Sequence, residues 1–339
     1  MDEDLNVFAQ QRMVFIGSAL RLFSIGGREA QRVLCSSGIQ FLKDIVGSKI
    51  VVTTRWWDPV IALLKLFKPE IVSVFIADGH FSLLNLNKTS NKRSGKNIFE
   101  SGYCDIYLLP DYESLKAVAG YPGLKYSYRP YYWDDPGIRL SDEEDKLYDI
   151  VFLYGNDPFF EAGGQSRLLT LVNQLLEHFS EQYSVAHVLP RGNNGELIAR
   201  NLAKRENIFV GLNNAKRALC RGSVYLCTPS TIVWQLLAAS GKAALIDVYD
   251  GDLCFHSSIL RVRKPGDLSE VLDKDEEYWA ELRDKTWRVL GKESIVDVLK
   301  GVFREKPSNV NTRANAWRLL RTHNFRDLLS STWSMALKK

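Results

Sequence analysis

Several features that would place this chain in a common class are missing from its 339 residues. No apolar run approaches the ~20 residues that a membrane-spanning helix needs, which argues against a protein built of such helices. The five cysteines are scattered and odd in number, and this favours reduced thiols over a disulfide framework. A GxGxxG segment, a P-loop and an internal repeat are also missing, so the commonest nucleotide-binding motifs and repeat folds are excluded.

The amino terminus lacks the pattern of a secretory signal. It begins Met1-Asp2-Glu3-Asp4, without an apolar core, so we expect a cytoplasmic protein. The content of 45% hydrophobic and 25% charged residues is typical of a globular protein. The net charge of +4 is unevenly distributed, because residues 304–339 contain eight Lys or Arg and only two acids. Since the basic charge is confined to this tail, nucleic acid is not an expected partner.

Strand and helix patterns alternate in two successive sets, which predicts an α/β protein with two parallel sheets. The first domain is expected over residues 1–135, a polar linker over 136–147, a second domain over 148–305, and a basic helix over 306–339. Residues 276–303 are expected to be helical. The predicted strands are residues 13–17, 49–54, 71–77, 105–109 and 125–128 in the first set and 149–154, 183–189, 208–212, 224–227 and 243–248 in the second.

A carboxylate follows one of the most apolar predicted strands. Asp78-Gly79-His80 comes directly after Ile71–Ala77, and ligands bind at the carboxyl ends of strands in open α/β sheets. A carboxylate at this point is well placed to act as a base on a substrate. The alternative is that Asp78 only caps a turn, as an Asp-Gly pair often does.

Three loops at predicted strand ends in the second half carry candidate ligand-binding residues. The first is Tyr154-Gly155-Asn156, which leads to Gly163-Gly164 before a helix. A glycine-rich turn at a helix start can bind a phosphate through backbone N–H groups. A plain strand–helix turn remains the alternative.

The second loop follows His187 and contains Pro190-Arg191. His187 and Leu189 share one face of the strand, and the guanidinium of Arg191 suits a phosphate. The alternatives are a hydrogen-bonded histidine inside the sheet and a solvated arginine.

The third loop ends in Ser230-Thr231 and opens an apolar helix. Hydroxyls at a helix start are ordinary N-caps, and together with free N–H groups they also bind anions. Both roles can hold at once.

These segments resemble those of bacterial sialyltransferases and polysialyltransferases that act on lipooligosaccharide and capsule. Phe15–Arg21 is similar to the family's opening strand and turn, and Ala77-Asp78-Gly79 to its acidic motif. His187–Arg191 lies where the family has a His-Pro pair, although Leu189 precedes Pro190 here, and Ser230-Thr231 is similar to its hydroxyl motif. The resemblance implies a GT-B fold, with two Rossmann-like domains facing across a cleft.

The resemblance also implies an inverting transfer of a sugar from a CMP-activated donor to a cell-surface glycan. Asp78 would be the catalytic base, and Ser18, Gly79 and His80 would contact the acceptor. The alternatives are another donor (CMP-Kdo, or a CDP- or UDP-linked group) and a protein that binds glycan or nucleotide without transfer. The residues expected to bind the donor are Gly155, Asn156, His187, Pro190, Arg191, Ser230 and Thr231.

No cofactor beyond the nucleotide sugar is expected. No Asp-x-Asp pair lies in an obvious donor loop, since Asp134-Asp135 lies in the linker, so no metal is predicted. The segment Asp247–Asp252 is read as a donor-side or solvated turn rather than a metal loop. The expected acceptor is a glycan or lipid-linked glycan. The basic C-terminal helix would either pack on the first domain or rest on the inner membrane as a peripheral contact.

Overall fold

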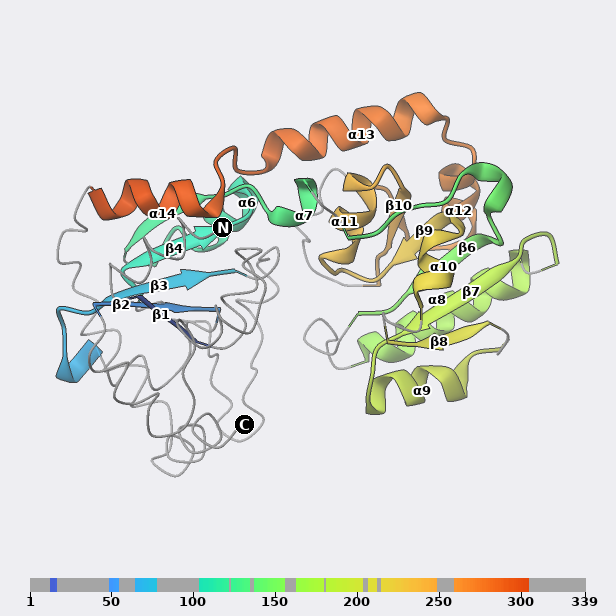
Figure 1. Cartoon of the computed structure of the whole chain (residues 1–339). Coiled ribbons are helices and arrows are strands. Elements are labelled where there is room, and N and C mark those ends of the chain that lie inside the picture. Colours follow the sequence, from blue (N-terminus) through green and yellow to red (C-terminus); the bar gives the residue numbers. More distant parts are fainter. Residues whose placement is uncertain are drawn as a thin grey trace. The chain divides into compact units, whose positions relative to one another are not determined.

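The computed structural model describes residues 13–16, 49–54, 65–77, 104–121, 123–134, 137–155, 163–179, 181–203, 207–211, 215–248 and 259–304. The chain divides into two compact units, Met1–Tyr131 together with Leu290–Lys339, and Tyr132–Val289. Each unit contains its own parallel sheet (Figure 1). The prediction of an α/β fold with two parallel sheets is therefore confirmed.

The first unit is built on a five-stranded parallel sheet whose strands follow one another in chain order. Its central strands are apolar on both faces, as is usual when a parallel sheet is covered on both sides. β2 has four buried residues, and β4 likewise. The strands are β1 (Met13–Ile16), β2 (Ile50–Thr53), β3 (Val72–Ile76), β4 (Ile106–Leu109) and β5 (Leu124–Ser127). The short helix α6 (Tyr112–Ala117) joins β4 to β5.

One face of this sheet is covered by a helix from far along the chain, α14 (Ile295–Arg304) (Figure 1). Apolar residues recur along α14 at the spacing of one helix face. They share a buried cluster with Val52, Val74 and Ile106, which lie at the same level of three neighbouring strands. The residues that α14 buries in this cluster are Ile295, Val298, Leu299 and Val302.

The expectation of one helix over 276–303 is wrong at residues 290–294. The structure has α13 (Glu276–Val289) and then α14, with a break where the chain returns to the first unit. In the break, a Cβ on Gly291 would overlap the backbone of Tyr128, and the backbone N–H of Arg129 donates to the carbonyl of Glu293 at 2.7 Å. Residues 290–304 thus belong with the first unit, whereas the sequence placed them in the second domain.

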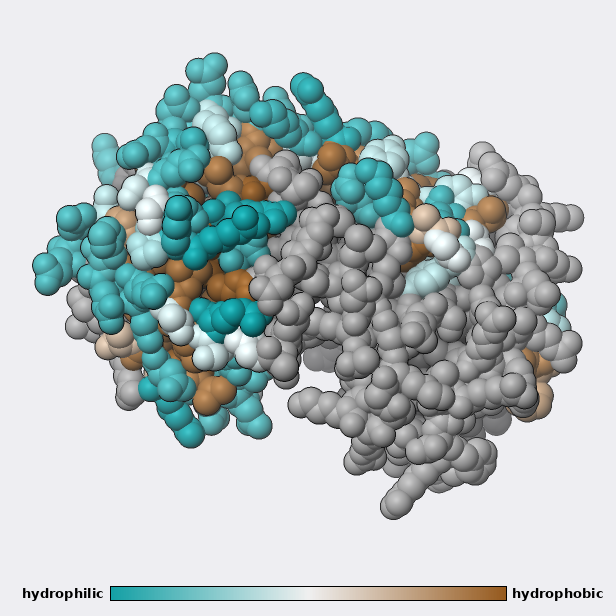
Figure 2. Space-filling model, turned by 180° about the vertical axis from the view of Figure 1, so that it is seen from behind, coloured by the Kyte–Doolittle hydropathy of each residue, from teal (hydrophilic) through white to brown (hydrophobic). Residues whose placement is uncertain are grey.

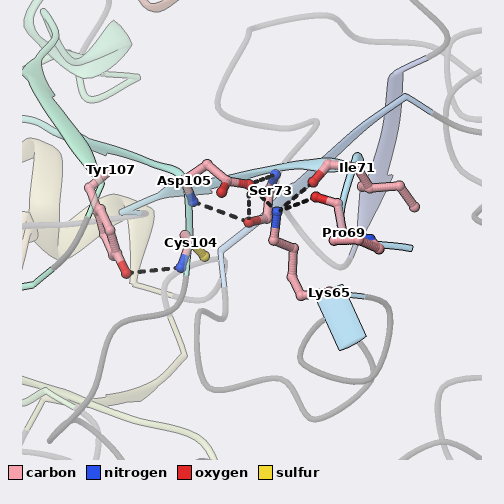
Figure 3. A network of polar contacts seen from close by, with 7 residues as sticks. All are labelled: Lys65, Pro69, Ile71, Ser73, Cys104, Asp105 and Tyr107. Carbon is pink, nitrogen blue, oxygen red and sulfur yellow. Dashed lines mark hydrogen bonds and ion pairs between the residues drawn. The ribbon is translucent and has the colours of Figure 1, made fainter. Parts of the chain in front are cut away.

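A buried polar network ties the beginnings of β3 and β4 together (Figure 3). The carboxylate of Asp105 accepts from Lys65 Nζ at 2.7 Å, from the backbone N–H of Ser73 at 2.7 Å and from Ser73 Oγ at 2.9 Å. Lys65 Nζ also donates to the carbonyl of Ile71 at 2.7 Å. Because this network lies at the amino ends of the strands, opposite the edge where ligands bind, its role is structural.

The second unit has a six-stranded parallel sheet with the order β11-β10-β9-β6-β7-β8. In chain order this is the doubly wound arrangement 3-2-1-4-5-6 of a Rossmann fold. Its strands are β6 (Tyr148–Leu153), β7 (Val185–Leu189), β8 (Ile208–Val210), β9 (Gly222–Cys227), β10 (Lys242–Ile246) and β11 (Arg261–Val262). Its helices are α7 (Tyr131–Asp134, which begins in the first unit), a 3-10 turn at Glu143–Asp145, α8 (Gly164–Phe179), α9 (Asn193–Asn201), α10 (Lys216–Cys220), α11 (Ile232–Ala238), α12 (Pro265–Leu272) and α13.

Helices lie over both faces of this second sheet. Right-handed crossovers put α8 and α9 on one face and α10 and α11 on the other. The strands and helices share one buried cluster, in which Trp234, Tyr225 and Phe152 are among the largest fully buried side chains. Seen from behind, the described surface of this unit is mainly hydrophilic with smaller hydrophobic areas (Figure 2). The apolar faces of its helices therefore turn inward.

Candidate functional site

The candidate site lies where the strand order of the second sheet reverses, between β6 and β9. The chain runs outward from β6 to β7 and β8 and then returns to β9 on the other side. The loops after β6 and β9 diverge at such a point and leave a crevice that ligands commonly occupy. Leu153 and Cys227 pair at the same level, so the loops that follow them start side by side.

Thr228 joins the two loops. Its Oγ1 accepts a hydrogen bond from the backbone N–H of Gly155 at 2.5 Å, and its own N–H donates to the carbonyl of Leu153 at 2.9 Å. A Cβ on Gly155 would lie 3.0 Å from Thr228 Oγ1 and 3.7 Å from Ser230 Cβ. Gly155 and Ser230, which the sequence predicts to bind one donor, are therefore neighbours.

The hydroxyls of Ser230 and Thr231 stand at the start of α11. Ser230 Oγ accepts from the N–H of Ile232 at 3.3 Å, whereas Thr231 makes no side-chain capping bond. Both residues are half-buried. Of the two, Ser230 is the one whose side chain lies beside Gly155.

α8 is the helix that follows β6 in the chain. Gly163 has φ of 83°, a conformation that glycine adopts without strain, and the first turn of α8 contains no acidic residue. The first turns of long helices carry partial positive charge. Arg167 Nε donates to the carbonyl of Val248 at 2.9 Å, so this helix start is fixed to the loop after β10.

His187 lies inside the sheet rather than at its edge. It is 1% exposed, its ring stacks at 5.1 Å on Phe152, and its Nδ1 is 3.0 Å from the hydroxyl oxygen of Tyr154. Burial lowers the pKa of His187 to about 4 and raises the pKa of Tyr154 well above its usual value. A neutral imidazole in this position favours the alternative of a hydrogen-bonded core histidine over a phosphate ligand.

Pro190 and Arg191 are not brought to the crevice in the same way. Pro190 is buried, and a Cβ on Gly195 would overlap its carbonyl oxygen. The Arg191 side chain lies over Gly211 at the end of β8, where a Cβ would be 2.7 Å from Arg191 Nε. Three strand spacings, or about 14 Å, separate β8 from β9, so Arg191 leans away from Ser230.

The predicted acceptor side falls outside the described residues. These are Ser18, Asp78, Gly79 and His80, and the donor residue Asn156 is outside them as well. Ala77, directly before Asp78, is described: its N–H donates to the carbonyl of Leu108 at 3.0 Å, and the Tyr128 hydroxyl donates to its carbonyl at 2.6 Å. The end of β3 is therefore fixed from two sides at the carboxyl edge of the first sheet.

Three charged residues at the same edge of the second sheet were not predicted as a group. Asp247 directly follows β10, and its Oδ2 pairs with Arg261 in β11 and with Arg263 directly after it. Sequence reasoning missed them because β11 has only two residues. The alternation Arg261-Val262-Arg263 was the available signal, since it puts both arginines on one side of a strand.

Among the residues described, no group of three or more His, Cys, Asp or Glu side chains is arranged to hold a metal ion. Within the same residues, no helix combines the length and the apolar character needed to cross a bilayer.

No protein-family model matches the chain, and no curated protein matches it in sequence. Among solved structures it is similar to sucrose-phosphate synthase from Thermosynechococcus elongatus, at 12% identity over 76% of this chain and 74% of that one, with a TM-score of 0.50. It is also similar to the wall teichoic acid polymerase TagF (10% identity, 97% and 94% covered, TM-score 0.48). A third structure is S. aureus MnaA with UDP (9% identity, 78% and 76% covered, TM-score 0.48). The likeness to sucrose-phosphate synthase concerns the fold: the chain has a glycosyltransferase-like GT-B fold.

Proposed function

We propose that the chain is an inverting glycosyltransferase of the sialyltransferase type, which transfers a sugar from a CMP-activated donor to a glycan acceptor. The observation that carries this proposal is the contact between Gly155 N and Thr228 Oγ1 at the reversal point of a 3-2-1-4-5-6 sheet. It supports a donor phosphate in the crevice, beside the hydroxyls of Ser230 and Thr231.

In the proposed reaction, Asp78 accepts the proton of an acceptor hydroxyl, a step typically worth ~10²–10⁴-fold in rate. The hydroxyl oxygen bonds to the anomeric carbon while the bond from that carbon to the phosphate oxygen breaks, and CMP leaves with the electron pair. Hydrogen bonds from Ser230 and Thr231 stabilise the charge that grows on the leaving phosphate. His187 stays neutral and holds its place through Tyr154.

The experiment is to incubate the purified chain with CMP-sialic acid and a panel of galactosides and to follow CMP release. Asp78→Asn should abolish transfer while CMP still binds, because the substitution removes only the proton acceptor. Asp284→Asn, at an exposed carboxylate on α13, serves as the matched control and should retain full activity. Transfer at near-normal rate by the Asp78→Asn variant would remove Asp78 from the mechanism.

A second candidate is a protein that binds nucleotide or glycan without transferring a sugar. The neutral, buried His187 and the Leu189 that precedes Pro190 favour it, since both differ from a charged phosphate contact. This candidate predicts a raised melting temperature with CMP, CDP, UMP or UDP and no CMP release over time. The same nucleotide series distinguishes a CMP-linked donor from a CDP- or UDP-linked one.

We also propose that transfer is independent of metal and that residues 306–339 form a basic amphipathic helix on an anionic membrane surface. The charge of the tail supports this location. Activity that survives EDTA would support the first point. Co-sedimentation with anionic liposomes, lost on removal of residues after Pro307, would support the second.

A further inference from the structure

Two arginines meet one buried carboxylate at the carboxyl edge of the second sheet. The Asp247 side chain is 1% exposed. Its Oδ2 accepts from Arg263 Nη2 at 2.7 Å, from Arg263 Nε at 3.0 Å and from Arg261 Nη1 at 3.3 Å. One negative charge thus orients two guanidinium groups.

The arginines keep donors that this carboxylate does not use. Arg263 is 61% exposed and its Nη1 takes no part in the contact, while Arg261 is 21% exposed and uses Nη1 alone. The nearby Asp267 is engaged elsewhere, because its Oδ2 accepts the backbone N–H groups of Arg263 at 2.8 Å and Lys264 at 3.2 Å. Both guanidinium groups therefore keep N–H donors for a ligand oxygen.

The strand register puts this pair beside the proposed phosphate site. Leu153, Cys227, Leu245 and Arg261 pair in a line across β6, β9, β10 and β11. Residues two positions further along, including Gly155, Asp247 and Arg263, therefore leave the sheet at one level. With strands ~4.8 Å apart, Asp247 follows the strand next to that of Ser230, and Arg263 follows the one beyond, about 10 Å away. One nucleotide-linked ligand can span this distance.

We propose that Arg261 and Arg263, oriented by Asp247, bind a second anionic group of the nucleotide-linked donor, apart from the phosphate at Gly155 and Ser230. This inference rests on the proposed function. The planar fork of arginine matches both a carboxylate and a phosphate, so the group is either the carboxylate of an acidic sugar or a second phosphate. Because the guanidinium groups are already oriented, little side-chain conformational freedom is lost on binding.

The test is calorimetric titration of the full chain with CMP, CDP and CMP-sialic acid. We expect the wild-type chain to bind either CDP or CMP-sialic acid at least tenfold more tightly than CMP. Arg263→Gln should abolish this preference, since a tenfold difference corresponds to about one charge-assisted hydrogen bond. It should leave the dissociation constant for CMP within about twofold. A gain with CDP identifies a phosphate, and a gain with CMP-sialic acid a carboxylate.

Arg200→Gln is the matched control, because Arg200 is an exposed arginine paired with Glu196 on α9, and it should behave as the wild type. Arg261→Gln, at the less exposed arginine, should likewise reduce the preference for CDP or CMP-sialic acid over CMP. Two results would overturn the inference and leave the proposed function standing. One is that the arginine variants lose affinity for CMP by the same factor as for CDP and CMP-sialic acid. The other is that both variants keep the wild-type preference for CDP or CMP-sialic acid over CMP. A wild-type chain that binds none of the three ligands would overturn both.

Discussion

The hydroxyl oxygen of Thr228 lies 2.5 Å from the backbone nitrogen of Gly155 and joins the ends of β9 and β6 where the strand order reverses. Thr228 is buried and Gly155 is half-buried. Two loops that are 73 residues apart in the chain are thereby fixed at the place where we propose that the donor phosphate binds.

Thr228→Val should destabilise the second unit by about 1 kcal/mol, the usual net contribution of one hydrogen bond, because it removes the acceptor of the Gly155 N–H. The affinity for CMP should fall as well, because the loop after β6 loses its attachment to the loop after β9. Urea unfolding and CMP titration measure the two effects. Thr228→Ser keeps the hydroxyl and should lose less on both counts; equal behaviour of the Val and Ser variants would contradict the role of the hydroxyl.

The sequence predicted the sheets well because the strands are apolar runs bounded by turns. The expected strands 71–77 and 183–189 correspond to β3 and β7 within about two residues. The two-residue strand β11 is too short for any periodicity to indicate. The break at Leu290–Ser294 could not be predicted either, because the contact that requires Gly291 involves Tyr128, far away in the chain.

The candidate site was predicted only in part. Neighbouring strand ends bring Gly155 and Ser230 together, and parallel topology alone indicates this. The alternation along β7 predicted which face of the sheet His187 lies on. It did not predict that His187 is buried, because helices cover both faces of a doubly wound sheet. Whether Arg191 leans toward β9 or β8 depends on Gly211, which leaves space for its side chain.

The stability of the second unit should depend on pH through His187. Burial lowers its folded-state pKa to about 4, below the ordinary value of about 6.5. Between these values the unfolded chain binds more protons, so stability rises with pH across this window. The free energy of unfolding of this unit is therefore highest, as far as His187 is concerned, above about pH 6.5. It falls by about 3 kcal/mol as the pH is lowered to about 4.

His187→Gln removes this titration and retains a polar partner for the Tyr154 hydroxyl. Hydrogen exchange of peptides covering β6 and β7, measured at pH 7 and pH 4.5, reports the local stability. The wild type should lose more protection than the variant on acidification, after correction for the intrinsic exchange rate. Parallel losses in the two proteins would show that His187 is not buried in its neutral form.

Replacing only one partner of the Lys65–Asp105 ion pair should strongly destabilise the fold. Both side chains are largely buried and 2.7 Å apart, so Lys65→Met leaves a carboxylate without its counter-charge, at a cost of about 3–5 kcal/mol. Lys116→Met is the control, since Lys116 pairs with Glu113 at the same 2.7 Å on the surface and should lose less than about 1 kcal/mol. Guanidinium chloride unfolding of the full chain compares them. Similar losses in the two variants would contradict a structural role for the buried pair.

Replacing Gly291 and Gly301 by alanine should change the stability of the protein in opposite directions. A Cβ on Gly291 would overlap the backbone of Tyr128, and backbone atoms have little freedom to move aside, so Gly291→Ala should destabilise the docking of α14. Gly301 lies within α14, is exposed, and a Cβ there would meet nothing within 4 Å. Gly301→Ala should therefore stabilise the helix by about 0.5–1 kcal/mol. Limited proteolysis and thermal unfolding of both variants test the pair. Destabilisation by Gly301→Ala, or tolerance of Gly291→Ala, would mean that α14 does not lie on the first sheet as described.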